Sequence, residues 1–288
     1  MILEKKRAET RFGEIAYTDR GEGPVALFVH GVFLNSYFWR HVVDRVCDAR
    51  RCVAVDLMSH GDSQAAPDQD ISFRAQAEML NAFCESLGFE QVDLVANDTG
   101  GAIAQIFAAR HPHRLATLTL TNCDTAENLP PEDFKPMVEL AAAGALAPSA
   151  VELFGDLDAA AQLSFGSSYE HLDRIDPGIV RSYLEPCIGT LERARQFERF
   201  LVALDAGDLV AVMPQLRKLT VPTLVVWGTG DTFFDVSWAY WLRDTIPGAT
   251  RVITVDDARL LFPEERPMDL VPHLEQHWSA AATPRGVS

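Results

Sequence analysis

The sequence contains no long apolar run and few basic residues. No stretch approaches the ~20 residues of a membrane-spanning helix, and charged residues interrupt the first seven, where a signal peptide needs an apolar segment. Asp and Glu (41) outnumber Lys and Arg (25), which gives a net charge of −16. This charge argues against nucleic acid or an anionic membrane as a partner. We therefore expect a cytoplasmic protein that binds a small molecule, and its oligomeric state stays open.

Cysteine is also scarce, and its spacing suggests no bound group. The five cysteines form no CxxC or zinc pattern, and their odd number leaves at least one free thiol in a monomer. Buried, reduced thiols are the plain interpretation for a cytoplasmic protein. Because the sequence shows neither a ligand cluster nor a phosphate-binding glycine motif, we expect no metal and no organic cofactor.

Apolar strand-like runs alternate with helical patterns in residues 1–123 and again in residues 214–288. This alternation predicts an α/β fold, with a mostly parallel sheet and helices on both faces. Between them, residues 124–213 show helical patterns separated by Pro and Gly and no strand-like run. We therefore expect an α/β core made of the two outer segments and a helical cap over the sheet. The expected strands are 15–18, 25–29, 51–55, 92–96, 115–121, 223–226 and 251–255.

The most informative motif lies in residues 91–105. An apolar run ends at Ala96, Asp98 stands between small residues at Ala96 and Gly100, and a helical pattern begins near Gly101. This is the layout of a nucleophile elbow, with Asp where Ser is commoner. Small neighbours are needed because such a turn strains its central residue and brings backbone segments close together. From this stretch alone, an ordinary helix N-cap at Asp98 is an equally good interpretation.

A second motif, His30-Gly31-Val32, follows the predicted strand 25–29. The backbone N–H of Val32, together with that of Thr99, would form an anion hole of the oxyanion type. For the His30 ring we favour a structural role in tying down loop backbone. Residues 56–63 are interpreted as a structural turn, with His60 exposed.

A third motif places Asp231 at the end of the late strand 223–226. A carboxylate there suits the acid of a catalytic triad, which orients an imidazole. A turn or capping role for Asp231 is equally open, because the acid role requires a histidine partner.

These motifs together resemble the α/β-hydrolases with a helical cap, in the branch with an Asp nucleophile: the haloalkane dehalogenases and epoxide hydrolases. The resemblance extends over nearly the whole chain and implies an α/β-hydrolase fold. It implies that Asp98 and Asp231 are catalytic and that Val32 and Thr99 form the oxyanion hole. The side chains expected to contact substrate are His30, Phe33, Trp39, Tyr169, His171, Tyr183 and Leu260.

The chain also departs from the family pattern. Alignment on the segment 262–267 places Leu260 where the family has its general-base histidine. Thr99 stands where haloalkane dehalogenases hold the halide with Trp, and Val32 stands where many of them use Asn. Epoxide hydrolases usually carry Pro at the position of Phe33 and need two cap tyrosines, for which Tyr169 and Tyr183 are available.

Three hypotheses follow from the missing histidine. The first is a hydrolase acting on a small, neutral, apolar electrophile (halide, epoxide or ester type), with Asp98 as nucleophile and a base from elsewhere, such as His171. The second is a lyase, isomerase or cyclase that uses Asp98 as general acid or base. The third is a binding protein without turnover. We favour the first because of the resemblance.

Overall fold

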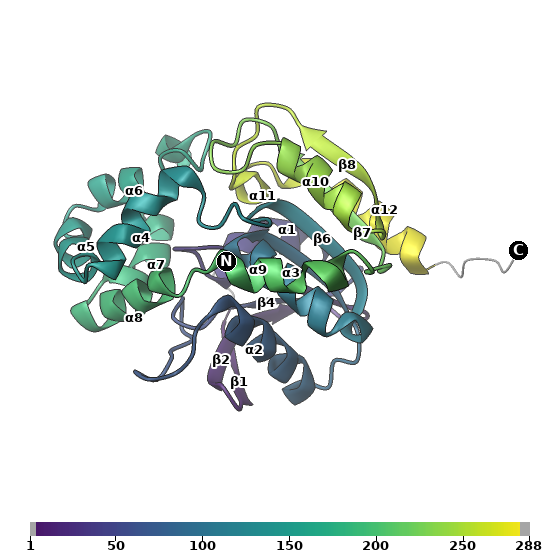
Figure 1. Ribbon diagram of the computed structural model, residues 1–288, viewed down its shortest axis with the longest axis horizontal. Coiled ribbons are helices and arrows are strands. Elements are labelled where there is room, and N and C mark those ends of the chain that lie inside the picture. Colours follow the sequence, from purple (N-terminus) through teal and green to yellow (C-terminus); the bar gives the residue numbers. More distant parts are fainter. Residues whose placement is uncertain (1–3, 283–288) are drawn as a thin grey trace, which may run out of the picture.

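The computed structural model describes residues 4–282, which form a sheet flanked by helices and a separate group of helices at one side (Figure 1). The eight strands lie in the order β1-β2-β4-β3-β5-β6-β7-β8. β1 and β2 form an antiparallel hairpin, β2 also pairs antiparallel with β4, and all other neighbours are parallel. The strands are β1 (Lys6–Thr10), β2 (Gly13–Arg20), β3 (Val25–Val29), β4 (Arg51–Val55), β5 (Val92–Asp98), β6 (Leu115–Cys123), β7 (Thr223–Gly228) and β8 (Ala249–Val255).

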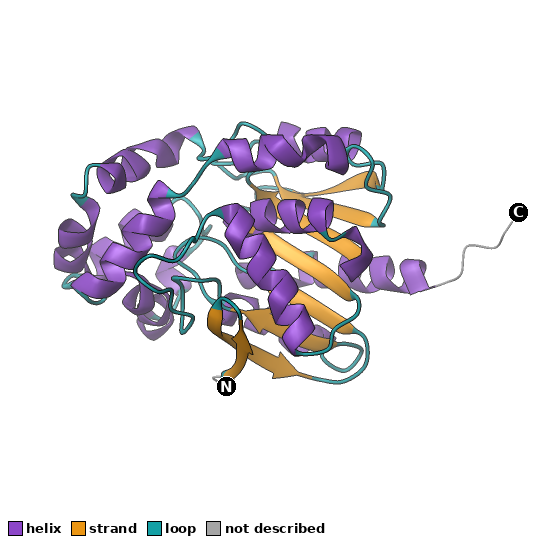
Figure 2. Ribbon diagram, turned by 60° about the horizontal axis from the view of Figure 1, so that its bottom comes forward, coloured by secondary structure: helices purple, strands orange, loops and turns teal. Residues whose placement is uncertain are grey.

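Helices cover both faces of the sheet (Figure 2). On one face α3 (Thr99–Arg110) contacts both α2 (Phe73–Ser86) and α9 (Ala206–Leu216), and on the other α1 (Arg40–Val46) contacts α12 (Val271–Ala282). α10 (Ser237–Thr245) packs on β7 and β8, and the short α11 (Phe262–Glu265) lies against α1. All residues of β3 after Val25 are buried, which explains why its sequence is a continuous apolar run. The predicted α/β-hydrolase fold is confirmed.

The segment that we assigned to the cap contains helices and no strand, and its last helix lies apart from the others. α4 (Lys135–Ala142), α5 (Leu146–Phe154), α6 (Leu157–Phe165), α7 (Pro177–Ile188) and α8 (Leu191–Val202) pack on one another. The predicted boundary after residue 213 falls inside α9, which packs on α3 of the core. The group α4–α8 is called the cap below.

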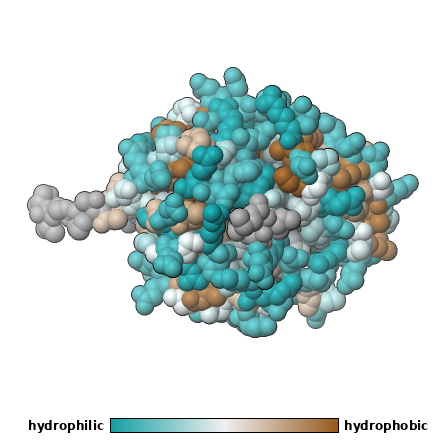
Figure 3. Space-filling model, turned by 180° about the vertical axis from the view of Figure 1, so that it is seen from behind, coloured by the Kyte–Doolittle hydropathy of each residue, from teal (hydrophilic) through white to brown (hydrophobic). Residues whose placement is uncertain are grey.

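The surface agrees with the strongly acidic composition. The face in Figure 3 is mostly hydrophilic, with small separate groups of apolar residues. Within residues 4–282, no single helix is long and apolar enough to cross a membrane. Two consecutive segments, Glu132–Ala142 and Leu146–Phe154, are long and apolar enough only when taken together, and the chain bends by 108° between them.

Candidate active site

Asp98 occupies a strained turn between β5 and α3. Its backbone angles are φ 57° and ψ −137°, and its side chain makes no capping bond to the first turn of α3. A positive φ at a residue other than glycine costs about 1–3 kcal/mol and persists only where the surroundings impose it. The elbow interpretation is therefore correct in its geometry, and the N-cap alternative is wrong.

Two glycines make this turn possible by leaving room for backbone contact. A Cβ at Gly31 would lie 2.0 Å from Oδ2 of Asp98, and one at Gly100 would lie 2.4 Å from the carbonyl oxygen of His30. Both distances are far below van der Waals contact. The loop after β3 and the elbow after β5 can approach each other only because neither position carries a side chain.

The close approach brings Val32 to the Asp98 carboxylate. The Val32 N–H donates a hydrogen bond of 2.9 Å to Oδ2 of Asp98, and the Thr99 backbone N–H also favours the charged form. Burial nevertheless raises the pKa of Asp98 to about 7, and the nearby charge of Asp231 adds to this effect. The two predicted anion-hole residues are thus adjacent to Asp98, and both line the same cavity as Asp98.

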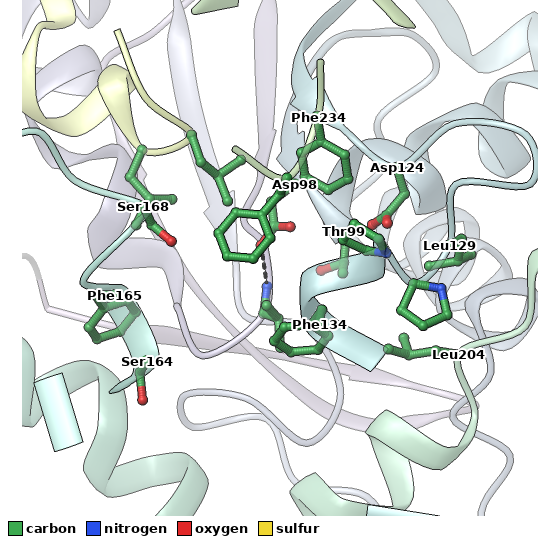
Figure 4. A pocket seen from close by; sticks show the side chains of 16 residues that line it. Asp98, Thr99, Asp124, Leu129, Phe134, Ser164, Phe165, Ser168, Leu204 and Phe234 are labelled. Carbon is green, nitrogen blue, oxygen red and sulfur yellow. Dashed lines mark hydrogen bonds between the residues drawn. The ribbon is translucent and has the colours of Figure 1, made fainter. Parts of the chain in front are cut away.

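The cavity is small and mostly apolar. Its volume is about 30 Å³, room for one or two water molecules. Core loops and the cap both contribute to the wall, as Figure 4 shows for the side chains that point inward. The lining residues are Val32, Asp98, Thr99, Asp124, Leu129, Pro130, Pro131, Phe134, Ser164, Phe165, Ser168, Leu204, Phe233, Phe234, Leu260 and Leu261.

Leu260 lines the cavity, as expected. The Nδ2 group of Asn97, beside the nucleophile, donates to the Leu260 carbonyl at 3.0 Å. This bond places the Leu260 side chain at the elbow, where the resemblance puts a histidine. No histidine in residues 4–282 lines the cavity.

The two histidines of the adjacent loops are buried behind the site. His30 Nδ1 donates to the Gly31 carbonyl at 2.8 Å, and Nε2 accepts the Leu57 N–H at 3.0 Å. Burial lowers the pKa of His30 to about 3, so the ring is neutral and ties two loops together. The expectation that His30 contacts substrate is wrong, and the structural interpretation is correct. His60 is also completely buried, against Phe197 and Phe200 of α8, so the prediction that it is exposed is wrong.

Phe33 and Trp39 are core residues rather than cavity-lining ones. Phe33, with φ 62°, packs against Phe165 and Phe197 of the cap. Trp39 is fully buried against Phe28 and Phe38. Neither side chain lines the cavity, because each packs against aromatic side chains of neighbouring elements. Their predicted substrate contacts are therefore wrong.

The two cap tyrosines bind a buried carboxylate instead of facing the site. Both hydroxyls donate to Glu264, and Arg40 forms an ion pair with the same carboxylate. All four side chains are buried, which is tolerable because the charges are paired and hydrogen-bonded. The expectation that Tyr169 and Tyr183 contact substrate is wrong: the Glu264 cluster joins cap and core.

His171 likewise lies away from Asp98. Its backbone N–H donates to Glu265 at 2.9 Å, and its side chain is exposed and lines a different cavity, with Arg40 and Glu264. It therefore cannot supply the missing base, and its predicted substrate contact is wrong.

Asp231 lies close to the site, but both of its carboxyl oxygens accept hydrogen bonds from neighbouring residues. Oδ2 accepts from Asn122 Nδ2 at 2.7 Å, and Oδ1 accepts the Phe233 N–H at 2.8 Å. Burial raises the pKa of Asp231 to about 6. Its neighbours Phe233 and Phe234 line the cavity, whereas Asp231 does not.

Sequence reasoning missed Asp124. It follows β6, is fully buried, and lines the cavity. No other residue donates a hydrogen bond to either of its carboxyl oxygens. The signal available in the sequence was an acid directly after a strand, the same signal that marked Asp231. Across residues 4–282, no group of three or more His, Cys, Asp or Glu side chains could hold a metal ion.

Comparisons with known proteins agree with this architecture. A family model described as "alpha/beta hydrolase fold" matches residues 24–147. A haloalkane dehalogenase of Mesorhizobium japonicum is 39% identical over 105 residues, which are 36% of this chain and only 34% of that protein's length. A cis-3-alkyl-4-alkyloxetan-2-one decarboxylase of Shewanella oneidensis is 27% identical over 287 residues, 94% of this chain and 86% of that protein.

A solved α/β-hydrolase-fold protein from Burkholderia ambifaria has a TM-score of 0.82 at 21% identity, with 94% of this chain and 97% of the other covered. At this identity the similarity concerns the fold. The sheet order and these matches together show an α/β-hydrolase fold, and the local sequence similarity is to haloalkane dehalogenases.

Proposed function

We propose that Asp98 is the nucleophile of an enzyme that acts on a small, neutral, apolar electrophile. The observation that carries this proposal is the position of Asp98: a strained elbow that aims a carboxylate into an apolar cavity with Leu260 opposite. A carboxylate that attacks carbon forms an ester, so the substrate must offer a carbon with a leaving group. A charged substrate would lose its hydration in this cavity without a partner charge, which favours neutral molecules.

The absence of a base beside Asp98 narrows the reaction. General-base assistance is typically worth about 10²–10⁴-fold, so an ester on Asp98 hydrolyses slowly here. A reaction whose intermediate breaks down without water fits this site better than hydrolysis does.

A strained four-membered lactone offers such a reaction. The Asp98 carboxylate attacks the saturated ring carbon that is bonded to the ring oxygen. The bond between this carbon and the ring oxygen breaks, and a carboxylate forms on the substrate. Loss of CO₂ then supplies the electron pair for a C=C bond while the Asp98 carboxylate departs. Atoms and charge balance, and neither water nor a base is consumed. The similarity over 94% of the chain to a protein named as an alkyl-alkyloxetanone decarboxylase supports this direction.

Hydrolysis of a halide or epoxide is the second candidate, supported by the local similarity to a haloalkane dehalogenase around the elbow. The two candidates share the first step at Asp98 and differ in how the ester breaks down. They are therefore distinguishable by product.

The test exposes the protein to three probes of equal chain length: a cis-dialkyl four-membered lactone, a terminal epoxide and a 1-bromoalkane. Intact mass reports an adduct, and gas chromatography reports alkene, diol or alcohol. We expect alkene from the lactone and long-lived Asp98 adducts from the other two probes. Rapid release of diol or alcohol would favour hydrolysis. Inertness to all three, or equal reactivity of Asp98→Asn, would overturn the nucleophile proposal and leave proton-transfer chemistry or ligand binding.

A further inference from the structure

We propose that Asp124 is a catalytic carboxylic acid that donates a hydrogen bond, and its proton where needed, to the oxygen leaving the carbon attacked by Asp98. This inference rests on the proposed role of Asp98. It makes the site selective for oxygen leaving groups, such as those of epoxides and small lactones, over halides.

Strand register brings the two carboxyls to one edge of the sheet. β5 and β6 are parallel neighbours, and Asp98 at the end of β5 pairs with Cys123 at the end of β6. Asp124 is the next residue. Both side chains line the cavity, as Figure 4 shows. Two groups that line one cavity can act on the two ends of a breaking bond.

The Asp124 backbone is anchored, but no other residue binds its carboxyl group. Its carbonyl oxygen accepts a 2.8 Å hydrogen bond from Gln105 Nε2 of α3, which anchors the backbone. Its carboxyl is 0% exposed, and both oxygens lack a partner from any other residue. A buried polar group without a partner costs free energy, so such groups call for an explanation. A ligand in the cavity would provide the missing partner.

The surroundings decide which carboxyl carries the proton. Asp98 accepts the Val32 N–H, and the nearby Thr99 N–H also stabilises its charge, whereas Asp124 has only its own backbone N–H. Burial raises the pKa of Asp124 well above its usual range, and the neighbouring Asp98 raises it further. Two close buried carboxyls cannot both ionise easily. The charge therefore resides on Asp98 and the proton on Asp124.

Proton release is then linked to the first chemical step. When Asp98 becomes an ester, its negative charge disappears, and the repulsion that kept Asp124 protonated disappears with it. For an epoxide, the proton moves from Asp124 to the alkoxide as the C–O bond breaks, which leaves Asp98 esterified and Asp124 ionised. For a lactone, the new group is a carboxylate, so Asp124 holds it by a hydrogen bond and keeps its proton.

Halide departure gains little from this arrangement, because a halide ion takes no proton near neutral pH. Two side-chain nitrogen donors that precede site residues are engaged elsewhere. Asn97 Nδ2 donates to the Leu260 carbonyl, and Trp227 Nε1 donates to the Phe234 carbonyl at 2.9 Å. Among the described residues, no Trp or Asn side chain lines the cavity.

The test compares Asp124→Asn with the wild type in adduct formation from an epoxide and from a 1-bromoalkane of equal length. Asn keeps the shape and a hydrogen-bond donor but cannot transfer a proton. We expect the epoxide rate to fall at least about 100-fold and the bromide rate to change by less than about threefold. Asp133→Asn, the same change at an exposed carboxyl, should affect neither rate. Equal loss with both probes would indicate a structural role, and no loss would exclude proton donation; either result overturns the proposal.

An infrared measurement decides the proton's location without any substrate. At pH 8, where Asp98 with its pKa of about 7 is mostly ionised, the wild type should show the C=O stretch of a buried carboxylic acid, and Asp124→Asn should lose most of it. A wild type without this band, or a variant that keeps it, contradicts the proposal. Failure of the wild type to react with every probe would instead contradict the role of Asp98.

Discussion

Asn97 Nδ2 donates a 3.0 Å hydrogen bond to the Leu260 carbonyl, across 163 positions of sequence. The residue next to Asp98 thus holds the loop after β8 in the position from which a base would act. If Asp98 is the nucleophile that we propose, an apolar side chain occupies the position at which the resemblance places the base.

Restoring an imidazole at this position should restore hydrolysis. We expect Leu260→His to speed the decay of an Asp98 adduct by about 10²–10⁴-fold, the usual worth of a general base. Decay is followed by intact mass after excess bromoalkane is removed. Leu261→His places the same ring elsewhere in the cavity wall and should leave decay slow. An adduct equally long-lived in Leu260→His would show that the base position was assigned to the wrong residue.

Adduct formation should depend on pH through the ionisation of Asp98. Only the carboxylate is nucleophilic, and burial raises the pKa of Asp98 to about 7. The rate with a bromoalkane should rise about tenfold per pH unit below pH 7 and level off above it. Because Asp124 keeps its proton while Asp98 ionises, Asp124→Asn should leave this midpoint nearly unchanged, whereas Asp231→Asn should move it to lower pH. A rate independent of pH from 5 to 9 would contradict the raised pKa.

Stability should fall as pH rises through the range in which these carboxyls ionise. Raised pKa values of Asp98, Asp124 and Asp231 mean that the native state binds more protons than the unfolded state between about pH 4 and 7. The free energy of unfolding therefore decreases with rising pH across this window.

Asp124→Asn removes one of these groups, so it should lose less stability than the wild type between pH 4 and 8. Urea denaturation at several pH values measures this difference. The exposed Asp133→Asn should follow the wild-type curve. If the free energy of unfolding of Asp124→Asn falls with pH as steeply as that of the wild type, Asp124 ionises as readily in the native state as in the unfolded state.

The cluster around Glu264 should contribute strongly to the attachment of the cap. Glu264→Ala leaves Arg40 buried without its carboxylate and removes the acceptor of both tyrosine hydroxyls. Loss of one partner of a buried pair costs about 3–5 kcal/mol in the free energy of unfolding, measurable by chemical denaturation. Glu132→Ala, which breaks the exposed pair with Lys135, should change it by less than about 1 kcal/mol. Similar effects of the two variants would contradict the assigned role of Glu264.

Several site features could not be predicted because their partners are distant in sequence. Tyr169 and Tyr183 have the residue type of substrate contacts, yet Glu264, 95 and 81 positions away, takes their hydroxyls. His60 lies in a loop of small and polar residues, and only the position of α8 over that loop buries it. Asp124 has the pattern of an ordinary loop acid, and its place beside Asp98 follows from the pairing of β5 with β6.

By itself, the sequence determined the order of strands and helices, the helical cap segment, the elbow at Asp98 and the absence of histidine at position 260. These features depend on local properties: apolar runs, helical spacing and small residues beside a turn. The tertiary structure alone decided which polar groups face the cavity and which bind one another. That choice depends on strand register and on the seating of the cap, because each buried polar group must find its partner among residues far away along the chain.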